Sequence, residues 1–145
     1  LRNGVTVPTH VLWHGSGIDT GQHDEHLARR YLQRRGWLIL TRNWCGAGGE
    51  IDIVARRRGI LAIVEVKTRA DAQQLLEPIS LAQRARISRA ARAFVQRHPH
   101  LNRLAVRFDL ITVDRSGLVA RLDHIVNAFD PPVRRTGAAP DRRVS

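Results

Sequence analysis

Cysteine, aromatic residues and long apolar runs are scarce in this chain, and each shortage excludes a class of protein. The single cysteine, Cys45, excludes an internal disulfide and is typical of a protein in a reducing cytoplasm. Aromatic residues make up 5% of the chain, which disfavours a platform on which single-stranded bases stack. No apolar stretch is long enough to span a membrane, and no apolar run after a basic start predicts a signal peptide. We therefore expect a cytoplasmic protein without a membrane span.

Lysine is nearly absent as well: of the 24 lysine and arginine residues, only Lys67 is a lysine. Arginine stays protonated at working pH, whereas the pKa of a lysine shifts when the side chain is buried or crowded. A single lysine two residues after Glu65 therefore favours a chemical role for Lys67. The alternative is that it is a remnant of sequence drift.

Acidic residues are few, and the net charge is +11. Such a charge favours a polyanionic partner, nucleic acid in the simplest case, with an anionic membrane surface as the alternative. No acidic residue occurs between Pro78 and Phe108, so a helix in this segment suits contact with a phosphate backbone. The alternative is that some of its arginines are only solvated. The residues predicted to bind nucleic acid are Arg84, Arg86, Arg89 and Arg92.

The length and hydrophobic content are those of one domain with an ordinary core: 145 residues, of which 43% are hydrophobic. Residues 1–18 lack periodicity and are predicted to form a flexible N-terminal extension. Residues 131–145 are rich in proline and arginine and are predicted to be a disordered basic tail. The folded domain is therefore expected to span residues 19–130.

Hydrophobic periodicity predicts an α/β fold in the order α-β-β-β-α-β-β, with helices packed on a mixed sheet. Gly36 is expected to end the first helix in a left-handed conformation. Glu25 falls on the inward face near the start of that helix, where it either interacts with the helix dipole or belongs to a buried polar site. The predicted helices span 22–35 and 80–96, and the predicted strands span 37–44, 50–55, 60–68, 106–113 and 118–127.

The strand predicted at 60–68 is apolar on both of its faces, which is typical of a central, buried strand. Alternation places Glu65 and Lys67 on one face of this strand, together with Leu61 and Ile63. Charges occur in buried positions when they are paired or bind a metal. The two charges therefore indicate a polar site at the end of a buried strand, the alternative being a solvated ion pair at an exposed edge.

The preceding strand is expected to bring further carboxylates to this site. A two-residue hairpin turn at 58–59 places Asp52 opposite Glu65 and Glu50 opposite Lys67, whereas a slip of one residue would turn one partner to the other face. Opposed Cβ atoms lie about 4.5–5.5 Å apart. Two carboxylates at that distance repel each other and shift each other's pKa unless a cation lies between them, and Mg²⁺ suits oxygen ligands of this kind. The hairpin therefore predicts a metal site at Asp52 and Glu65.

Two segments of this hairpin, Gly-Glu-Ile-Asp-Ile-Val-Ala at 49–55 and Glu-Val-Lys-Thr-Arg at 65–69, resemble the PD-(D/E)XK nuclease superfamily. Within it, the chain is similar to the YraN family of small bacterial proteins, which resemble archaeal Holliday-junction resolvases in fold. The resemblance covers roughly residues 21–129. The further residues that carry it are Glu25, 28–32, Arg107, Phe108, Asp109 and 124–129.

The resemblance implies a restriction-endonuclease-like mixed β-sheet flanked by helices, with a metal-dependent nuclease site. Asp52, Glu65 and the carbonyl group of Val66 would hold one or two Mg²⁺ or Mn²⁺ ions. Lys67 would orient or activate the attacking water, and Glu25 would complete the site through water or as a further ligand. DNA is the implied substrate, and a homodimer is the implied assembly because a two-fold partner suits a symmetric junction.

The chain departs from the family pattern at two positions. Gln83 stands where a lysine is usual near the start of the second helix, and Asp24 stands where a glycine is common. Some relatives in the superfamily use glutamine at the first position, so Gln83 is kept, with Glu50, as a supporting site residue.

Three hypotheses about function follow. The first is a Mg²⁺-dependent endonuclease acting on DNA, branched or otherwise structured. The second is a nucleic-acid-binding protein that has the same fold but little or no cleavage activity. The third is an interaction module whose basic surface binds an acidic protein or a membrane.

Overall fold

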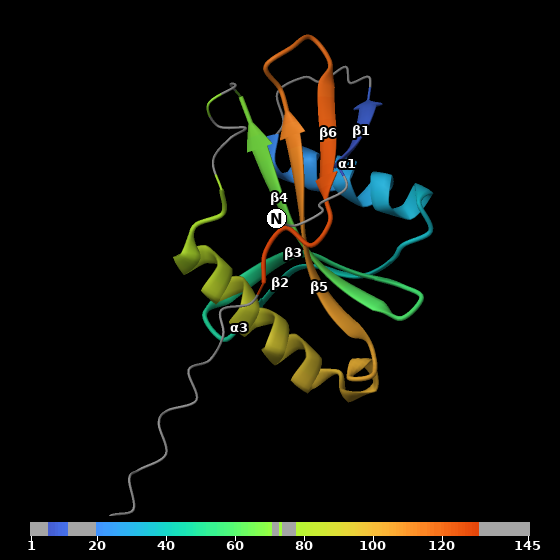
Figure 1. Ribbon diagram of the computed structural model, residues 1–145, viewed down its shortest axis with the longest axis vertical. Helices are drawn as coiled ribbons and strands as arrows, with labels where there is room; N and C mark the ends of the chain where they lie inside the picture. Colours follow the sequence, from blue (N-terminus) through green and yellow to red (C-terminus); the bar gives the residue numbers. More distant parts are fainter. Residues whose placement is uncertain (1–5, 12–19, 71–72, 74–77, 131–145) are drawn as a thin grey trace, which may run out of the picture.

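A mixed β-sheet carries a helix on each of its faces (Figure 1). The computed structural model describes residues 6–11, 20–70, 73 and 78–130. The strand order in the sheet is β1-β6-β5-β4-β3-β2. The predicted order α-β-β-β-α-β-β is confirmed from the first helix onward.

The predicted helices and strands are present, with ends that move by a few residues. Ser80 caps the second long helix, and Gly36, with φ of 83°, follows the first helix in the expected left-handed conformation. The elements are β1 (Thr6–Val11), α1 (Thr20–Arg34), β2 (Leu38–Gly46), β3 (Gly49–Arg57), β4 (Ile60–Arg69), α3 (Leu81–Arg97), the 3₁₀ helix η1 (Pro99–Leu101), β5 (Ala105–Asp114) and β6 (Ala120–Ile125).

Strand β1 was not predicted from the sequence. It pairs antiparallel with β6, from Thr6 opposite Ile125 to Val11 opposite Ala120, at one edge of the sheet. Residues 6–11 fall in the predicted flexible extension, and they contain Pro8, which an edge strand tolerates. The rest of that predicted extension and the predicted tail at 131–145 lie outside the described residues.

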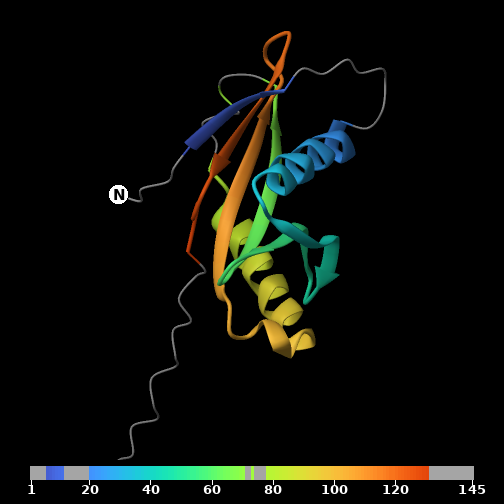
Figure 2. The ribbon, with the colours of Figure 1, turned by 90° about the vertical axis from the view of Figure 1, so that its right-hand side faces the viewer.

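Strand β4 is the buried centre of the sheet, as its two apolar faces predicted. It pairs antiparallel with β3 and parallel with β5. Leu61 and Ile63 pack in the core beneath α3, whereas Ala62 and Val64 pack beneath α1, which lies along the opposite face (Figure 2). The face that carries Leu61 and Ile63 is therefore the face on which Glu65 projects toward α3. No helix in the described part of the chain is both long and apolar enough to cross a membrane.

Candidate active site

The β3–β4 hairpin brings Asp52 and Glu65 together. Its pairing runs from Arg57 opposite Ile60 to Ile53 opposite Val64, which confirms the predicted register over these residues. The same register, continued by one pair, sets Asp52 beside Glu65. The backbone N–H of Val66 donates a hydrogen bond to Asp52 Oδ2 at 2.7 Å, so this carboxylate is fixed against β4.

The two carboxylates line a small cavity between the hairpin and the first turns of α3. Its volume is about 150 Å³. The cavity contains the two residues that were predicted to support the site, Glu50 and Gln83, as well as the two carboxylates. We call it the carboxylate cavity; its lining residues are Glu50, Asp52, Glu65, Gln83, Arg86 and Ile87.

Burial gives both carboxyl groups an unusual affinity for protons. It raises the pKa of Asp52 to about 7, with a further contribution from the negative charge of Glu65. Burial also raises the pKa of Glu65, although the ammonium group of Lys67 opposes this. Two carboxyl groups that share a hydrogen bond, one buried and one half-buried, hold either a shared proton or a cation. The pair is therefore suited to exchange a proton for a metal ion near neutral pH.

Lys67 reaches the same pair from β4. Its Nζ lies 3.1 Å from Glu65 Oε1, and its side chain is 27% exposed, so the ammonium group lies at the rim of the site. The shared face of Glu65 and Lys67 follows the alternation that the sequence predicted. The ammonium is placed where it can contact both Glu65 and a phosphate or water that enters from solvent.

Gln83 contacts the same oxygen of Glu65 as Lys67 does. Its Nε2 donates a hydrogen bond to Glu65 Oε1 at 2.7 Å. The Ser80 hydroxyl accepts a hydrogen bond from the backbone N–H of Gln83 at 3.2 Å, so the side chain starts from a capped first turn of α3. At the position where the resemblance implied a lysine, this chain therefore presents a neutral hydrogen-bond donor to Glu65.

Gly49 allows β3 to approach α3 closely enough to form the cavity. A Cβ atom at this position would lie 2.3 Å from the carbonyl oxygen of Arg86, a contact that backbone atoms do not tolerate. The sequence indicated only a flexible turn at 46–49. The turn residues are Ala47 and Gly48, which have positive φ angles, whereas Gly49 is the point of helix–strand contact.

Glu25 lies on α1, within electrostatic reach of the pair. Burial raises its pKa, a hydrogen bond with the side chain of Asn43 lowers it, and the charges of Asp52 and Glu50 raise it further. Glu25 therefore belongs to the electrostatic surroundings of the site.

The donor set suits a hard divalent ion. Among the described residues, no three or more His, Cys, Asp and Glu side chains converge as metal ligands. Mg²⁺ is commonly bound by one or two carboxylates with water in the remaining positions. Asp52 and Glu65, which attract a positive charge, fit this requirement, and the predicted Val66 carbonyl would add a third oxygen. Glu25 and Glu50 are electrostatic neighbours of this pair.

Asp24 is a buried anchor for the start of α1, next to Glu25. Its carboxylate accepts hydrogen bonds from the Thr68 hydroxyl and from Arg115 Nε, the latter at 3.0 Å. The sequence showed Asp24 only as a departure from the family pattern. Its partner Arg115 is 91 residues away along the chain, so no local signal could have indicated the contact.

The arginines predicted to bind nucleic acid are not equivalent. Arg86, Arg89 and Arg92 are exposed on α3, and Arg86 also lines the carboxylate cavity. Arg84 is half-buried, and its Nε donates a hydrogen bond to the carbonyl of Ile79 at 2.8 Å. Arg84 therefore also stabilises the entry to α3, and the binding role of all four stays a prediction.

Comparison with known proteins gives one consistent family. Residues 24–113 match the model of a family described as "Uncharacterised protein family UPF0102". A UPF0102 protein of Synechococcus sp. (strain JA-3-3Ab) is 37% identical over 121 residues, which cover 77% of this chain and 90% of that protein. A UPF0102 protein of Nitratidesulfovibrio vulgaris (strain DP4) is 43% identical over 114 residues, which cover 77% of this chain and 84% of that protein. A UPF0102 protein of Dinoroseobacter shibae is 41% identical over 98 residues, which cover 68% of this chain and 73% of that protein.

Proposed function

The chain belongs to the uncharacterised protein family UPF0102, and we propose that it is a metal-dependent endonuclease that acts on DNA. The observation that carries this proposal is the buried pair of Asp52 and Glu65 with Lys67 at its rim. The protein has a net charge of +11, so the two neighbouring carboxyl groups of Asp52 and Glu65 indicate that negative charge is needed at this one site.

Asp52, Glu65 and the carbonyl of Val66 would hold Mg²⁺ or Mn²⁺. A bound ion of this kind polarises a phosphate and lowers the pKa of water. Asp52 is oriented for this task by the N–H of Val66, and Glu65 by Gln83. The raised pKa of both groups means that metal binding releases a proton from the pair.

Lys67 would act on the reacting phosphate. Its ammonium can donate a hydrogen bond to the attacking water or to a phosphate oxygen, and it adds positive charge where negative charge develops. Glu25, whose pKa is raised by burial, would complete the site through water or as a further ligand. The exposed arginines of α3 next to the carboxylate cavity would hold the DNA backbone.

A second candidate function is DNA binding without cleavage. Gln83 supports it, because this position supplies no positive charge to the site, unlike the usual lysine of the family. The loss of one cation would weaken stabilisation of the transition state while leaving DNA contacts in place.

A cleavage assay separates the two candidates. The purified protein is incubated with linear, nicked, single-stranded and four-way-junction DNA, with and without Mg²⁺ or Mn²⁺. We expect metal-dependent cleavage that is lost in Asp52→Ala and Lys67→Ala and kept in Asp123→Asn, a matched change on β6. Cleavage that survives both alanine changes would rule out the site, and tight binding without cleavage by the native chain would establish the second candidate.

The assembly is part of the same proposal. Similarity to resolvases predicts a homodimer, which sedimentation equilibrium would detect as twice the chain mass of 16.4 kDa. A monomer at micromolar concentration would contradict this prediction without affecting the site.

A further inference from the structure

A second cavity, lined mainly by arginine, lies between the end of α1 and the β3–β4 turn. Its volume is about 570 Å³, and it shares no lining residue with the carboxylate cavity. Along β3, Arg57 is five residues from Asp52, which corresponds to about 16 Å of strand. We call it the arginine cavity; its lining residues are Arg35, Gly36, Leu38, Arg56, Arg57 and Arg58.

The lining of this cavity is strongly basic: four of its six residues are arginines, and none is acidic. Arg56, Arg57 and Arg58 are consecutive, and no described carboxylate forms an ion pair with any of them. Arginine cannot relieve the mutual repulsion by losing a proton, so these three side chains favour the binding of an anion.

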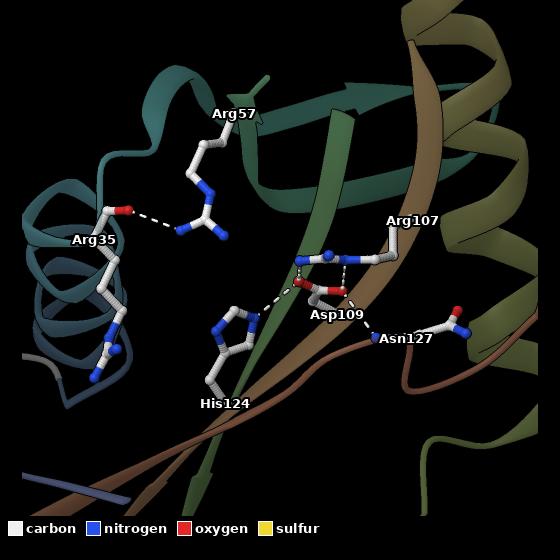
Figure 3. A network of polar contacts seen from close by, with 6 residues as sticks. All are labelled: Arg35, Arg57, Arg107, Asp109, His124 and Asn127. Carbon is white, nitrogen blue, oxygen red and sulfur yellow. Dashed lines mark hydrogen bonds and ion pairs between the residues drawn. The ribbon is translucent and has the colours of Figure 1, made fainter. Parts of the chain in front are cut away.

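The guanidinium group of Arg57 is held in place by the protein. Its Nη1 donates a hydrogen bond to the carbonyl of Arg35 at 2.9 Å (Figure 3). Its Cζ lies 4.8 Å from the ring centroid of Trp37, which is only 5% exposed. The C-terminal turn of α1 and a buried aromatic ring therefore fix one donor at the cavity before any ligand arrives.

Trp37 is itself supported by a second arginine whose charge is neutralised. Arg107 lies 5.3 Å from the Trp37 ring and makes two hydrogen bonds of 2.9 Å to the buried Asp109. Asp109 also contacts His124 Nε2 at 2.8 Å and accepts a bond from the N–H of Asn127 at 3.0 Å (Figure 3). Burial alone would raise the pKa of Asp109, but the hydrogen bonds from His124 and Arg107 lower it overall. Arg107 is thus part of the scaffold, and the positive charge at the cavity belongs to its lining arginines.

We propose that the arginine cavity is a second binding site for the sugar–phosphate backbone of duplex DNA, separate from the carboxylate cavity and from α3. The proposal rests on DNA being the substrate. Guanidinium groups bind phosphate through paired hydrogen bonds, and four of the six lining residues carry this group. Contacts to the sugar–phosphate backbone add affinity and orientation. Leu38, which is 62% exposed, supplies an apolar contact at the cavity edge for a deoxyribose.

The test is the salt dependence of DNA binding by the full chain. Fluorescence anisotropy measures the Kd for a linear duplex of about 20 base pairs, two helical turns. The double variant Arg56→Gln/Arg58→Gln is compared with Arg30→Gln/Arg121→Gln, which loses the same charge at exposed positions outside both cavities and α3. Arg56→Lys/Arg58→Lys keeps the charge, and urea denaturation checks that each variant is folded.

We expect Arg56→Gln/Arg58→Gln to weaken binding about tenfold and to reduce the slope of log K against log salt by about two. The lysine variant recovers most of the affinity, and the matched control changes the slope by less than one. Equal slopes and affinities for the glutamine variant and the control would overturn the second site.

The result separates this inference from the proposed function. A glutamine variant that binds weakly while no form of the protein cleaves DNA would support the cavity and refute the nuclease. DNA cleavage by the native chain, together with unchanged DNA binding in Arg56→Gln/Arg58→Gln, would support the nuclease and refute the cavity as a binding site. Binding of anionic vesicles that depends on Arg56 and Arg58, in a protein that does not bind duplex DNA, would overturn DNA as the occupant.

Discussion

Asp52 and Glu65 lie close together in a position where two ionised carboxyl groups destabilise the fold. Burial and mutual repulsion disfavour the state in which both are ionised, and the raised pKa values express this cost. A structural role would be served better by apolar residues, since β4 from Ile60 to Val64 is apolar on both faces. The pair is explained if the protein gains a metal ion there.

The cost of the pair should appear in the stability of the metal-free protein. With a pKa of about 7 in the folded state, Asp52 holds a proton that the unfolded chain loses near pH 4, so stability falls as pH rises between about 4 and 7. Asp52→Asn removes this loss and should raise the free energy of unfolding at pH 8 by up to about 4 kcal/mol. Urea denaturation in EDTA between pH 4 and 9 measures the effect. An Asn variant that is no more stable than the native chain at pH 8 would contradict the raised pKa.

Lys67 should act on the reaction more than on DNA binding. Lys67→Gln removes the ammonium group near Glu65 and should slow cleavage by about a hundredfold or more, with little change in Kd. Lys67→Arg keeps the charge but not its compact shape, so we expect it to restore less than a tenth of the lost rate. Single-turnover cleavage and anisotropy separate the two quantities. A rise in Kd that accounts for the whole effect would show Lys67 to be only a phosphate contact.

At the scale of elements, the central hairpin was predictable because two local rules agree. Alternation along β4 assigned Glu65 and Lys67 to one face, and the two-residue turn at 58–59 set the register that β3 and β4 adopt. Both rules depend on neighbouring residues only. The sequence therefore indicated the acidic pair before any tertiary contact was known.

Elements fixed by distant contacts were not predictable in this way. β1 has no apolar alternation and takes its strand conformation from pairing with β6. The anchoring of α1 by Asp24 requires Arg115, from the far end of the chain. Gln83 is a polar residue at the start of a helix, and only the packing of α3 against the hairpin directs it to Glu65.

Gly49 controls that packing. Gly49→Ala sets a Cβ atom against the backbone of Arg86, so β3 and α3 must separate, which should destabilise the fold by about 2 kcal/mol. The control is Gly59→Ala, in the turn at the other end of β3, because nothing lies within 4 Å of a Cβ atom there. Urea denaturation compares the two variants. Equal stability of both would show that the contact at Gly49 is easily relaxed.

At the scale of the whole molecule, the acidic pair is embedded in a strongly basic protein. Arg86 of α3 lines the carboxylate cavity, further exposed arginines follow along the helix, and the arginine cavity lies at the other end of β3. The basic residues attract a polyanion over a wide surface, whereas the negative charge of Asp52 and Glu65 is confined to one site. The composition alone predicts a polyanionic partner, whereas the position of the second cavity required the fold.

Metal binding should stabilise the whole fold in a manner that depends on pH. An ion that binds only the folded state adds about 1.4 kcal/mol at a concentration of about ten times its Kd. Because the ion displaces a proton from a group with a pKa of about 7, the same Mn²⁺ concentration should stabilise the protein less at pH 6 than at pH 8. Thermal unfolding with and without Mn²⁺ measures this, with Asp52→Asn as the variant that should not respond. A metal effect that is the same in both proteins would place the ion elsewhere.

The most direct measurement is the rate of DNA cleavage under single-turnover conditions as Mg²⁺ is titrated, for the native chain, Asp52→Asn and Asp123→Asn. The account predicts cleavage that requires Mg²⁺ in the native chain and in Asp123→Asn, and that falls more than about a hundredfold in Asp52→Asn. Cleavage at the native rate by Asp52→Asn, or cleavage without a divalent metal, would contradict it.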